Sequence, residues 1–149
     1  MVCPDFVLGT LSMAVGELVE RTLAPLDLRL RHYRLLRLLY FEGKRQQSTI
    51  GPVLGIDRTT VVVIVDHLEK LKLAKRFRSS EDRRAYVIAI TDKGKRVSEK
   101  STELVNAVEA SMFSPLTEEE QNLVRKLSAR LLLHPGIIAE AHAKLARAD

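Results

Sequence analysis

The sequence predicts a mainly α-helical fold with one β-hairpin among the helices, in the order α-α-α-α-β-β-α-α. Three observations predict it. Apolar residues recur at a helical period over most of the 149-residue chain, and one stretch near residue 86 alternates instead. Aromatic residues make up only 5% of the chain and Trp is absent, so the core must be mostly aliphatic. The length suits one domain, or one domain with helical extensions.

Two helices are predicted in the first third of the chain. The first runs from Phe6 to Leu23, and Pro25 ends it or begins the next turn. The second runs from about Leu30 to Phe41, and Glu42-Gly43 ends it. Its inward residues are Leu35, Leu38 and Leu39, and its outward residues are Arg31, Arg34 and Arg37.

A short helix and a longer helix follow, separated by a tight turn. The short helix is predicted from about Thr49 to Leu54, with Ser48 as its N-cap and Pro52 in its first turns. Gly55 closes it, and Asp57 then caps a longer helix that reaches about Leu71. This order is the helix-turn-helix arrangement.

The next stretch is predicted to form a β-hairpin. Residues 86–90 read Tyr-Val-Ile-Ala-Ile, an alternation with the period of a strand, and residues 74–78 are the partner strand. Residues 79–84 form the loop between them. Because this hairpin directly follows the second helix of a helix-turn-helix, it is interpreted as the wing of a winged helix.

The last part of the chain is predicted to be helical. Thr91 caps a long helix from Asp92 to about Phe113, and residues 117–120, Thr-Glu-Glu-Glu, form a capping box that opens another helix through Leu131. Pro135-Gly136 breaks that helix, and the alanine-rich tail is again helical. We therefore expect an N-terminal helix in 1–29, a winged helix-turn-helix lobe in 30–91, and a long helix followed by C-terminal helices in 92–149.

Positive charge is concentrated in the predicted winged helix. Residues 30–90 carry thirteen basic and six acidic side chains, a net charge of +7, whereas residues 1–29 carry a net charge of −2. A partner with many phosphates, such as double-stranded DNA, is one interpretation of this segment. A solvated basic surface is the alternative.

The second helix of the unit presents candidate base-reading side chains. With Val61, Ile64, Val65 and Leu68 on the buried face, the outward side of its N-terminal half carries Thr59, Val62 and Val63, and Arg58 is placed for a phosphate. Valine methyl groups suit the methyl group of thymine. The alternative is that Val63 packs on another part of the protein. Since no Arg, Asn or Gln lies on this half-face, we expect DNA shape to contribute to specificity.

The hairpin tip carries Arg83 and Arg84 side by side. A wing beside a helix in the major groove reaches the adjacent minor groove, whose negative potential attracts arginine. Arg76 and Arg78 on the first strand are expected to bind phosphates and set the register. The alternative is that the tip arginines only increase solubility.

Residues 55–95, "GIDRTTVVVIVDHLEKLKLAKRFRSSEDRRAYVIAITDKGK", resemble the MarR family of transcriptional regulators. The resemblance rests on the recognition helix, the Asp-x-Arg wing tip at Asp82 and Arg84, and the following element from Ile90 to Gly94. It implies a homodimer joined through an N-terminal dimerisation helix in 1–29 and the C-terminal dimerisation helices in 92–149. Such a dimer binds a pseudo-palindromic operator, usually as a repressor, and is released by a small phenolic or anionic ligand or by cysteine oxidation. The residues expected to contact DNA are Ser48, Arg58, Thr59, Thr60, Val62, Val63, His67, Arg76, Arg78, Arg83 and Arg84.

The chain departs from the family pattern at three places. Lys72 stands where a glycine usually ends the recognition helix, and a residue other than glycine with positive φ costs about 1 kcal/mol. Gly51-Pro52 replaces the common Ala-Glu of the supporting helix, and Arg29 replaces the usual Ser or Thr cap of the second helix. None of these departures removes a predicted DNA contact.

An effector site is expected at the second helix, where His32, Arg34 and Arg37 offer positive charge to an anion. The alternative is a solvated helix face. Cys3, the single cysteine, is a weak candidate for an oxidation sensor because it lies in the first residues of the chain, without the tyrosine partners that the family's sensing cysteine has.

Other function classes find little support in the sequence. The chain has no zinc-protease histidine pair, phosphate-binding loop or nucleophile elbow, so no enzyme and no cofactor is expected. Its four histidines, His32, His67, His134 and His142, lack the spacing of metal ligands. No signal peptide is visible and the longest apolar run, Val61–Val65, is too short to span a bilayer, so a cytoplasmic protein is expected. The remaining alternative is a winged helix that binds protein rather than DNA.

Overall fold

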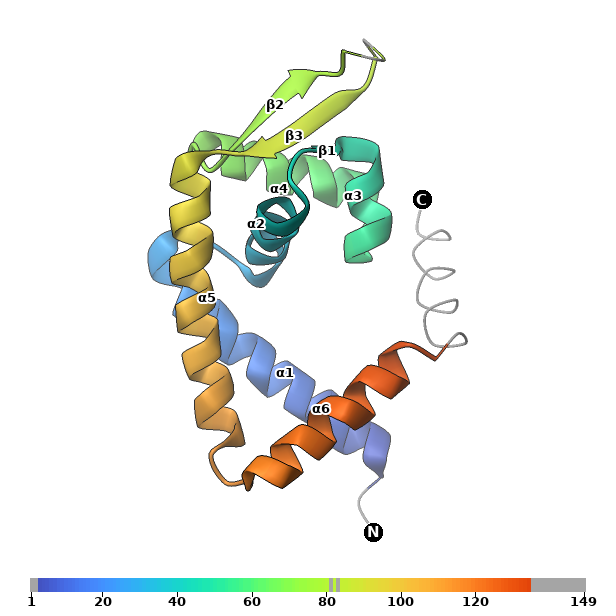
Figure 1. The fold of residues 1–149 in the computed structure, drawn as a ribbon, viewed down its shortest axis with the longest axis vertical. Coiled ribbons are helices and arrows are strands. Elements are labelled where there is room, and N and C mark those ends of the chain that lie inside the picture. Colours follow the sequence, from blue (N-terminus) through green and yellow to red (C-terminus); the bar gives the residue numbers. More distant parts are fainter. Residues whose placement is uncertain (1–2, 81, 83, 135–149) are drawn as a thin grey trace.

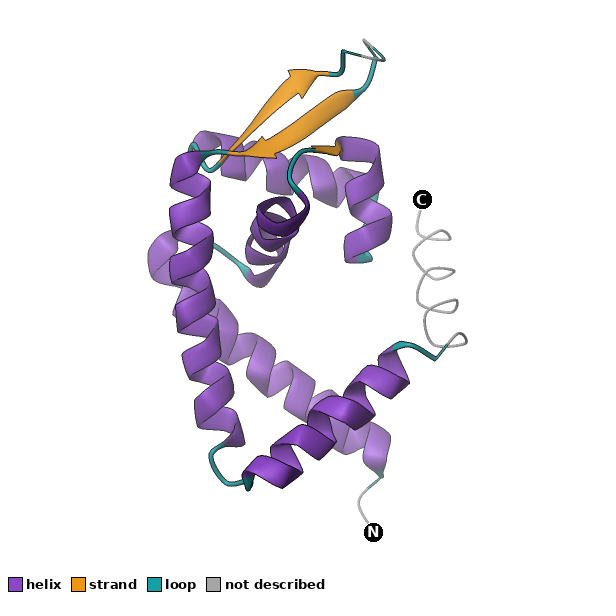
Figure 2. Ribbon diagram, in the orientation of Figure 1, coloured by secondary structure: helices purple, strands orange, loops and turns teal. Residues whose placement is uncertain are grey.

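The computed structural model describes residues 3–80, 82 and 84–134. A mainly helical chain with a small antiparallel sheet confirms the predicted fold class (Figure 2). The helical tail predicted after Pro135 lies outside the described residues. The elements in chain order are α1 (Pro4–Leu23), the 3-10 helix η1 (Ala24–Leu26), α2 (Leu30–Glu42), β1 (Arg45–Gln46), α3 (Gln47–Leu54), α4 (Arg58–Lys70), β2 (Ala74–Arg78), β3 (Tyr86–Ile90), α5 (Asp92–Phe113) and α6 (Glu118–Leu132).

Helices α2, α3 and α4 pack around an aliphatic core that fixes the direction of α4. Val61, Ile64, Val65 and Leu68 of α4 are each at most 1% exposed, which confirms the predicted buried face of this helix. They meet fully buried residues of the other elements, namely Leu35, Leu36, Leu39, Ile50 and Ile88. Burial of this apolar surface, worth about 25 cal/mol per Å², leaves the opposite face of α4 directed away from the core.

The sheet has three strands in the order β1-β3-β2, all antiparallel. Strands β2 and β3 form the predicted wing, with Ala74 opposite Ile90 and Arg78 opposite Tyr86. Strand β1 was not predicted, because two residues are too few to show an alternating pattern. It pairs with the middle of β3 and so attaches the wing to the helical lobe.

The predicted N-cap of α3 is wrong. The helix begins at Gln47 directly after β1, so its cap residue is Gln46, and Ser48 lies inside the first turn. The Thr49 hydroxyl donates a hydrogen bond of 2.9 Å to the Gln46 carbonyl. Because the helix starts earlier than predicted, Pro52 lies in its interior and not in its first turns. In the interior, the missing N–H of proline removes one helical hydrogen bond.

The three other predicted caps are confirmed. The Asp57 carboxylate opens α4, and the Thr91 hydroxyl opens α5 by accepting the Gly94 N–H at 2.9 Å. At α6 the Thr117 N–H donates to Glu120 at 2.8 Å, while Thr117 accepts in return from the Glu120 N–H. These caps pair amide groups that the helices themselves leave unbonded.

The turn between α4 and β2 uses a left-handed residue that is not glycine. Lys72 has φ of 62°, as the comparison with the family glycine predicted, and the Leu73 N–H closes the helix on the Leu68 carbonyl at 2.8 Å. Gly94 lies against the same turn, and a Cβ there would be 2.0 Å from the Leu73 carbonyl oxygen. Glycine at this position therefore allows α5 to start directly beside the base of the wing.

The long helices extend away from the lobe. Figure 1 shows α5 descending from the base of the wing, with α1 and α6 below the lobe. Helix α1 packs against α5, and the start of α6 meets the end of α5, where the Gln121 side chain donates to the carbonyls of Phe113 and Leu116. Among the described residues no single helix is both long and apolar enough to cross a bilayer, and the one pair that meets these criteria jointly is α3 with α4, bent by 111°.

Candidate DNA-binding interface

The outward face of α4 is the centre of the candidate interface. Arg58 and Thr59 are exposed, Val62 is half-buried, and Val63 remains 52% exposed. The packing of Val63 inside the protein, which was the alternative, would have required a much smaller exposed fraction. The N-terminal half of α4 therefore presents a short polar and apolar surface of the size that fits a groove.

Thr60, which was also predicted to contact DNA, has its hydroxyl engaged within the protein. The hydroxyl hydrogen-bonds the Asp57 carboxylate, and the Thr60 N–H donates to the same carboxylate at 2.8 Å. These two hydrogen bonds stabilise the ionised carboxylate and so lower the pKa of Asp57, and the bond from the hydroxyl has the larger effect. Thr60 therefore stabilises the start of the recognition helix.

Arg76 connects the wing to the recognition helix. Its guanidinium forms ion pairs with Asp66 and Glu69 of α4, and its backbone N–H donates to Glu69 at 2.8 Å. Only 20% of the side chain is exposed, so much of its hydrogen-bonding capacity is already used inside the protein. Asp66 and Glu69 were not identified from the sequence, although two acidic residues three positions apart just before a basic strand are the signal that points to them.

The wing tip is organised by Asp82. Its carboxylate accepts the Arg84 N–H at 2.9 Å, and its carbonyl accepts the Ala85 N–H at 2.9 Å. The Ser79 N–H in turn donates to the Ala85 carbonyl at 2.9 Å. In the Asp-x-Arg pattern the aspartate thus folds the turn and the exposed Arg84 is held at its end. Arg83, the other predicted tip residue, lies outside the described residues.

Arg78 lies on the exposed edge of the wing, with its guanidinium carbon 4.1 Å from the centre of the Tyr86 ring. This cation–π contact orients the cation across the two strands.

Ser48 is exposed in the first turn of α3, at the other end of the helix-turn-helix.

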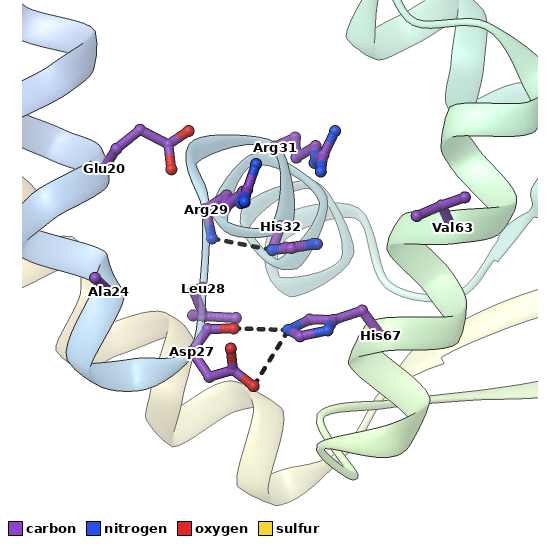
Figure 3. A pocket seen from close by; sticks show the side chains of 9 residues that line it. All are labelled: Glu20, Ala24, Asp27, Leu28, Arg29, Arg31, His32, Val63 and His67. Carbon is purple, nitrogen blue, oxygen red and sulfur yellow. Dashed lines mark hydrogen bonds and ion pairs between the residues drawn. The ribbon is translucent and has the colours of Figure 1, made fainter.

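His67 of α4 faces the linker between α1 and α2 rather than open solvent. Its Nε2–H donates to the Asp27 carbonyl at 2.7 Å, and its ring stacks on His32 with centroids 4.4 Å apart (Figure 3). The His32 Nδ1 accepts the Arg29 N–H at 2.9 Å, which is half of a capping box. One predicted DNA contact and one predicted effector residue are therefore in direct contact with each other.

The structure separates the three predicted effector residues into two clefts. His32 lines a cleft of about 680 Å³ between the end of α1, the start of α2 and α4. Arg34 and Arg37 line a second cleft of about 380 Å³ between α2 and α3, together with Tyr33, Leu38, Phe41, Glu42 and Leu54. No group of three or more metal-ligating side chains lies close together in the described part of the chain.

Comparisons with known proteins agree with this geometry. Residues 26–85 match the model of the MarR family, a range that covers the helix-turn-helix and most of the wing. An uncharacterized HTH-type transcriptional regulator of Bacillus subtilis, YhbI, is 26% identical over 115 residues, which are 77% of this chain and 75% of that protein.

Solved structures share the architecture over most of the chain. A MarR-family transcriptional regulator from Rhodococcus sp. RHA1 is 27% identical with a TM-score of 0.77, over 87% of this chain and 91% of that one. A mutant of MarR from E. coli in complex with operator DNA has the same fold, with a TM-score of 0.77 at 19% identity over 86% of this chain and 92% of that one. With the capped α4 and the Asp-x-Arg wing described above, these matches show that the chain is similar to the MarR family of transcriptional regulators in its helix-turn-helix and wing, and that it shares the fold of solved members of that family.

Proposed function

We propose that the protein is a repressor that binds a pseudo-palindromic operator as a homodimer, with α4 of each protomer in the major groove and Arg84 in the adjacent minor groove. The observation that carries this proposal is the exposed Val63 beside the exposed Thr59, on a helix whose opposite face is fully buried. An exposed valine gains from contact with a thymine methyl group, and threonine adds a hydrogen bond. Arg58 and Arg78 are assigned to phosphates, and Arg76 positions the wing.

The homodimer is supported by two apolar helix faces that lack a partner within the described chain. On α1, Leu8, Leu11 and Leu18 recur at helical spacing and are 57%, 48% and 48% exposed. On α6, Leu123, Leu127 and Leu131 recur at helical spacing and are 53%, 46% and 53% exposed. Burying these faces between two protomers removes the apolar surface from water, and it places two copies of α4 on one duplex.

An effector is proposed for the cleft between α2 and α3. The Arg37 guanidinium carbon lies 4.2 Å from the centre of the Phe41 ring, so one wall offers both positive charge and an aromatic surface, which suits an aromatic carboxylate. Such a ligand releases the operator only if it binds the DNA-free spacing of the two lobes more tightly than the DNA-bound spacing. Thermal unfolding in the presence of 4-hydroxybenzoate tests this effector site. The ligand is expected to raise the unfolding midpoint of the wild-type protein but not that of Arg37→Gln.

The operator-binding proposal is tested by sedimentation of the protein with a fluorescent random-sequence duplex pool at several salt concentrations. Two protomers per duplex, with affinity falling steeply as salt increases, is the expected result. A monomer whose duplex affinity does not depend on salt would contradict the proposal and favour a winged helix that binds protein.

A further inference from the structure

Two arginines outside the predicted DNA-binding set lie beside the recognition helix. Arg29 precedes α2 and Arg31 lies in its first turn, and both are exposed on the wall of the cleft that Val63 and His67 of α4 also line (Figure 3). Within the described residues, neither guanidinium has an ion-pair partner, in contrast to Arg76. Both charges are therefore available to a partner that approaches this surface.

Two acidic side chains line the same cleft, but both have partners. Glu20 accepts the Leu30 N–H at 3.2 Å, and an Asp27 carboxylate oxygen lies 3.7 Å from the Nε2 of His67. The local potential is nevertheless positive enough to act on a neighbouring group. The pKa of His32 is lowered mainly by burial, next by His67, and then by the positive charges of Arg31 and Arg29.

The position of this surface matches the geometry of a duplex. In Figure 1 the wing lies on one side of α4 and α2 lies on the other. The major groove is about 12 Å wide and both of its edges are phosphate strands, so a helix inserted into it has phosphates on either side. With α4 inserted in the groove, the wing would face one of these edges and the Arg29–Arg31 surface would face the other.

We propose that Arg29 and Arg31 bind a backbone phosphate of the operator at the edge of the major groove opposite the wing. This inference rests on the proposed operator binding. The two arginines hold the register of α4 from the second side and do not read bases. Their charges therefore add affinity that is the same for every sequence and falls with salt.

The test measures the salt dependence of duplex binding for Arg31→Gln, Arg29→Gln and the double variant, with a duplex that the wild-type protein binds. Each lost phosphate contact lowers the slope of log affinity against log salt by about 0.9, so the double variant, which removes this contact from both protomers, lowers it by about 1.8, and each single variant lowers it by part of that amount. Arg31→Lys retains the charge and is expected to keep most of the slope. Lys100→Gln, which removes a positive charge from the exposed surface of α5, is the matched control and leaves the slope unchanged.

An unchanged slope in the double variant, while the wild-type protein shows strong salt dependence, would overturn this inference and leave operator binding intact. Loss of base preference with an unchanged slope would also overturn it, because it would assign the arginines to base reading. Binding of inorganic phosphate in a calorimeter that Arg31→Gln abolishes, together with an unchanged slope on DNA, would identify a site for a free anion instead. Absence of duplex binding by the wild-type protein would contradict the proposed function itself.

Discussion

The imidazole rings of His32 and His67 stack with their centroids 4.4 Å apart and their planes inclined by 18°. This contact joins the first turn of α2 to the recognition helix, and the hydrogen bond from His67 to the Asp27 carbonyl adds the linker after α1. Burial first, and then the charges of His67, Arg31 and Arg29, lower the pKa of His32 from 6.5 to about 4. The neutral ring is also required for Nδ1 to accept the Arg29 N–H.

The free energy of unfolding is therefore expected to fall on acidification. Because the pKa of His32 is lower in the folded state than in the unfolded state, the unfolded state binds more protons between pH 6.5 and 4. Stability is fully present above about pH 6.5 and is lost as the pH falls towards 4, by on the order of 3 kcal/mol at most. Urea unfolding at fixed protein concentration and several pH values measures this loss of stability. His32→Gln should flatten the dependence of the free energy of unfolding on pH, and the control His134→Gln should not. An identical pH dependence in His32→Gln and the wild-type protein would contradict the assignment.

Arg84→Ala is expected to weaken operator binding without unfolding the dimer. The Arg84 side chain is exposed and its backbone is held by Asp82, so the loss of the guanidinium removes the proposed minor-groove contact and not a structural one. The loss should be about 1–3 kcal/mol, or roughly tenfold to hundredfold in affinity. Fluorescence anisotropy at moderate salt measures it, with thermal unfolding as the control for folding. Unchanged affinity would rule out the wing-tip assignment.

Leu127→Glu is expected to convert the proposed homodimer into monomers. Leu127 lies in the middle of the apolar face of α6, and a two-fold interface would bury the new carboxylate twice, at a cost of several kcal/mol for each unpaired charge. Sedimentation velocity measures the change. Ala129→Glu adds the same charge on the other side of α6 and should leave the dimer intact. A stable Leu127→Glu dimer would place the interface elsewhere.

Gly94→Ala is expected to destabilise the junction of wing and α5 by about 1–3 kcal/mol. The added Cβ would lie 2.0 Å from the Leu73 carbonyl oxygen and 2.7 Å from Ile90, so the start of α5 or the turn must move. Gly16→Ala is the control, since a Cβ at Gly16 meets nothing within 4 Å, and it should be neutral or stabilising. Equal stability of the two variants by urea unfolding would show that the junction relaxes freely.

Local side-chain chemistry explains which elements could be predicted from the sequence. Asp57, Thr91 and Thr117 cap helices through hydrogen bonds to residues three positions later, so the helix starts can be identified from short patterns. The start of α3 could not, because it follows β1, a strand of two residues that exists only by pairing with β3 some forty residues later. Ser48 fits a cap locally, and the long-range pairing overrides it.

The same distinction holds for the candidate interface. The face of α4 follows from helical periodicity, so Thr59 and Val63 could be identified from the sequence. The ion pair of Arg76 with Asp66 and the stack of His32 on His67 join residues 10 and 35 positions apart, and no local pattern marks such contacts. Arg34 and Arg37 share a helix with His32, yet a turn of that helix directs them to a different cleft.

Selection of bound sequences from a random duplex library, repeated at two salt concentrations, tests the central claim most directly. The predicted result is an enriched palindrome whose half-sites lie about one helical turn apart, bound with an affinity that falls steeply with salt. If no sequence is enriched after several rounds and the protein binds the library only weakly and in a salt-sensitive way, sequence-specific operator recognition by this protein is contradicted.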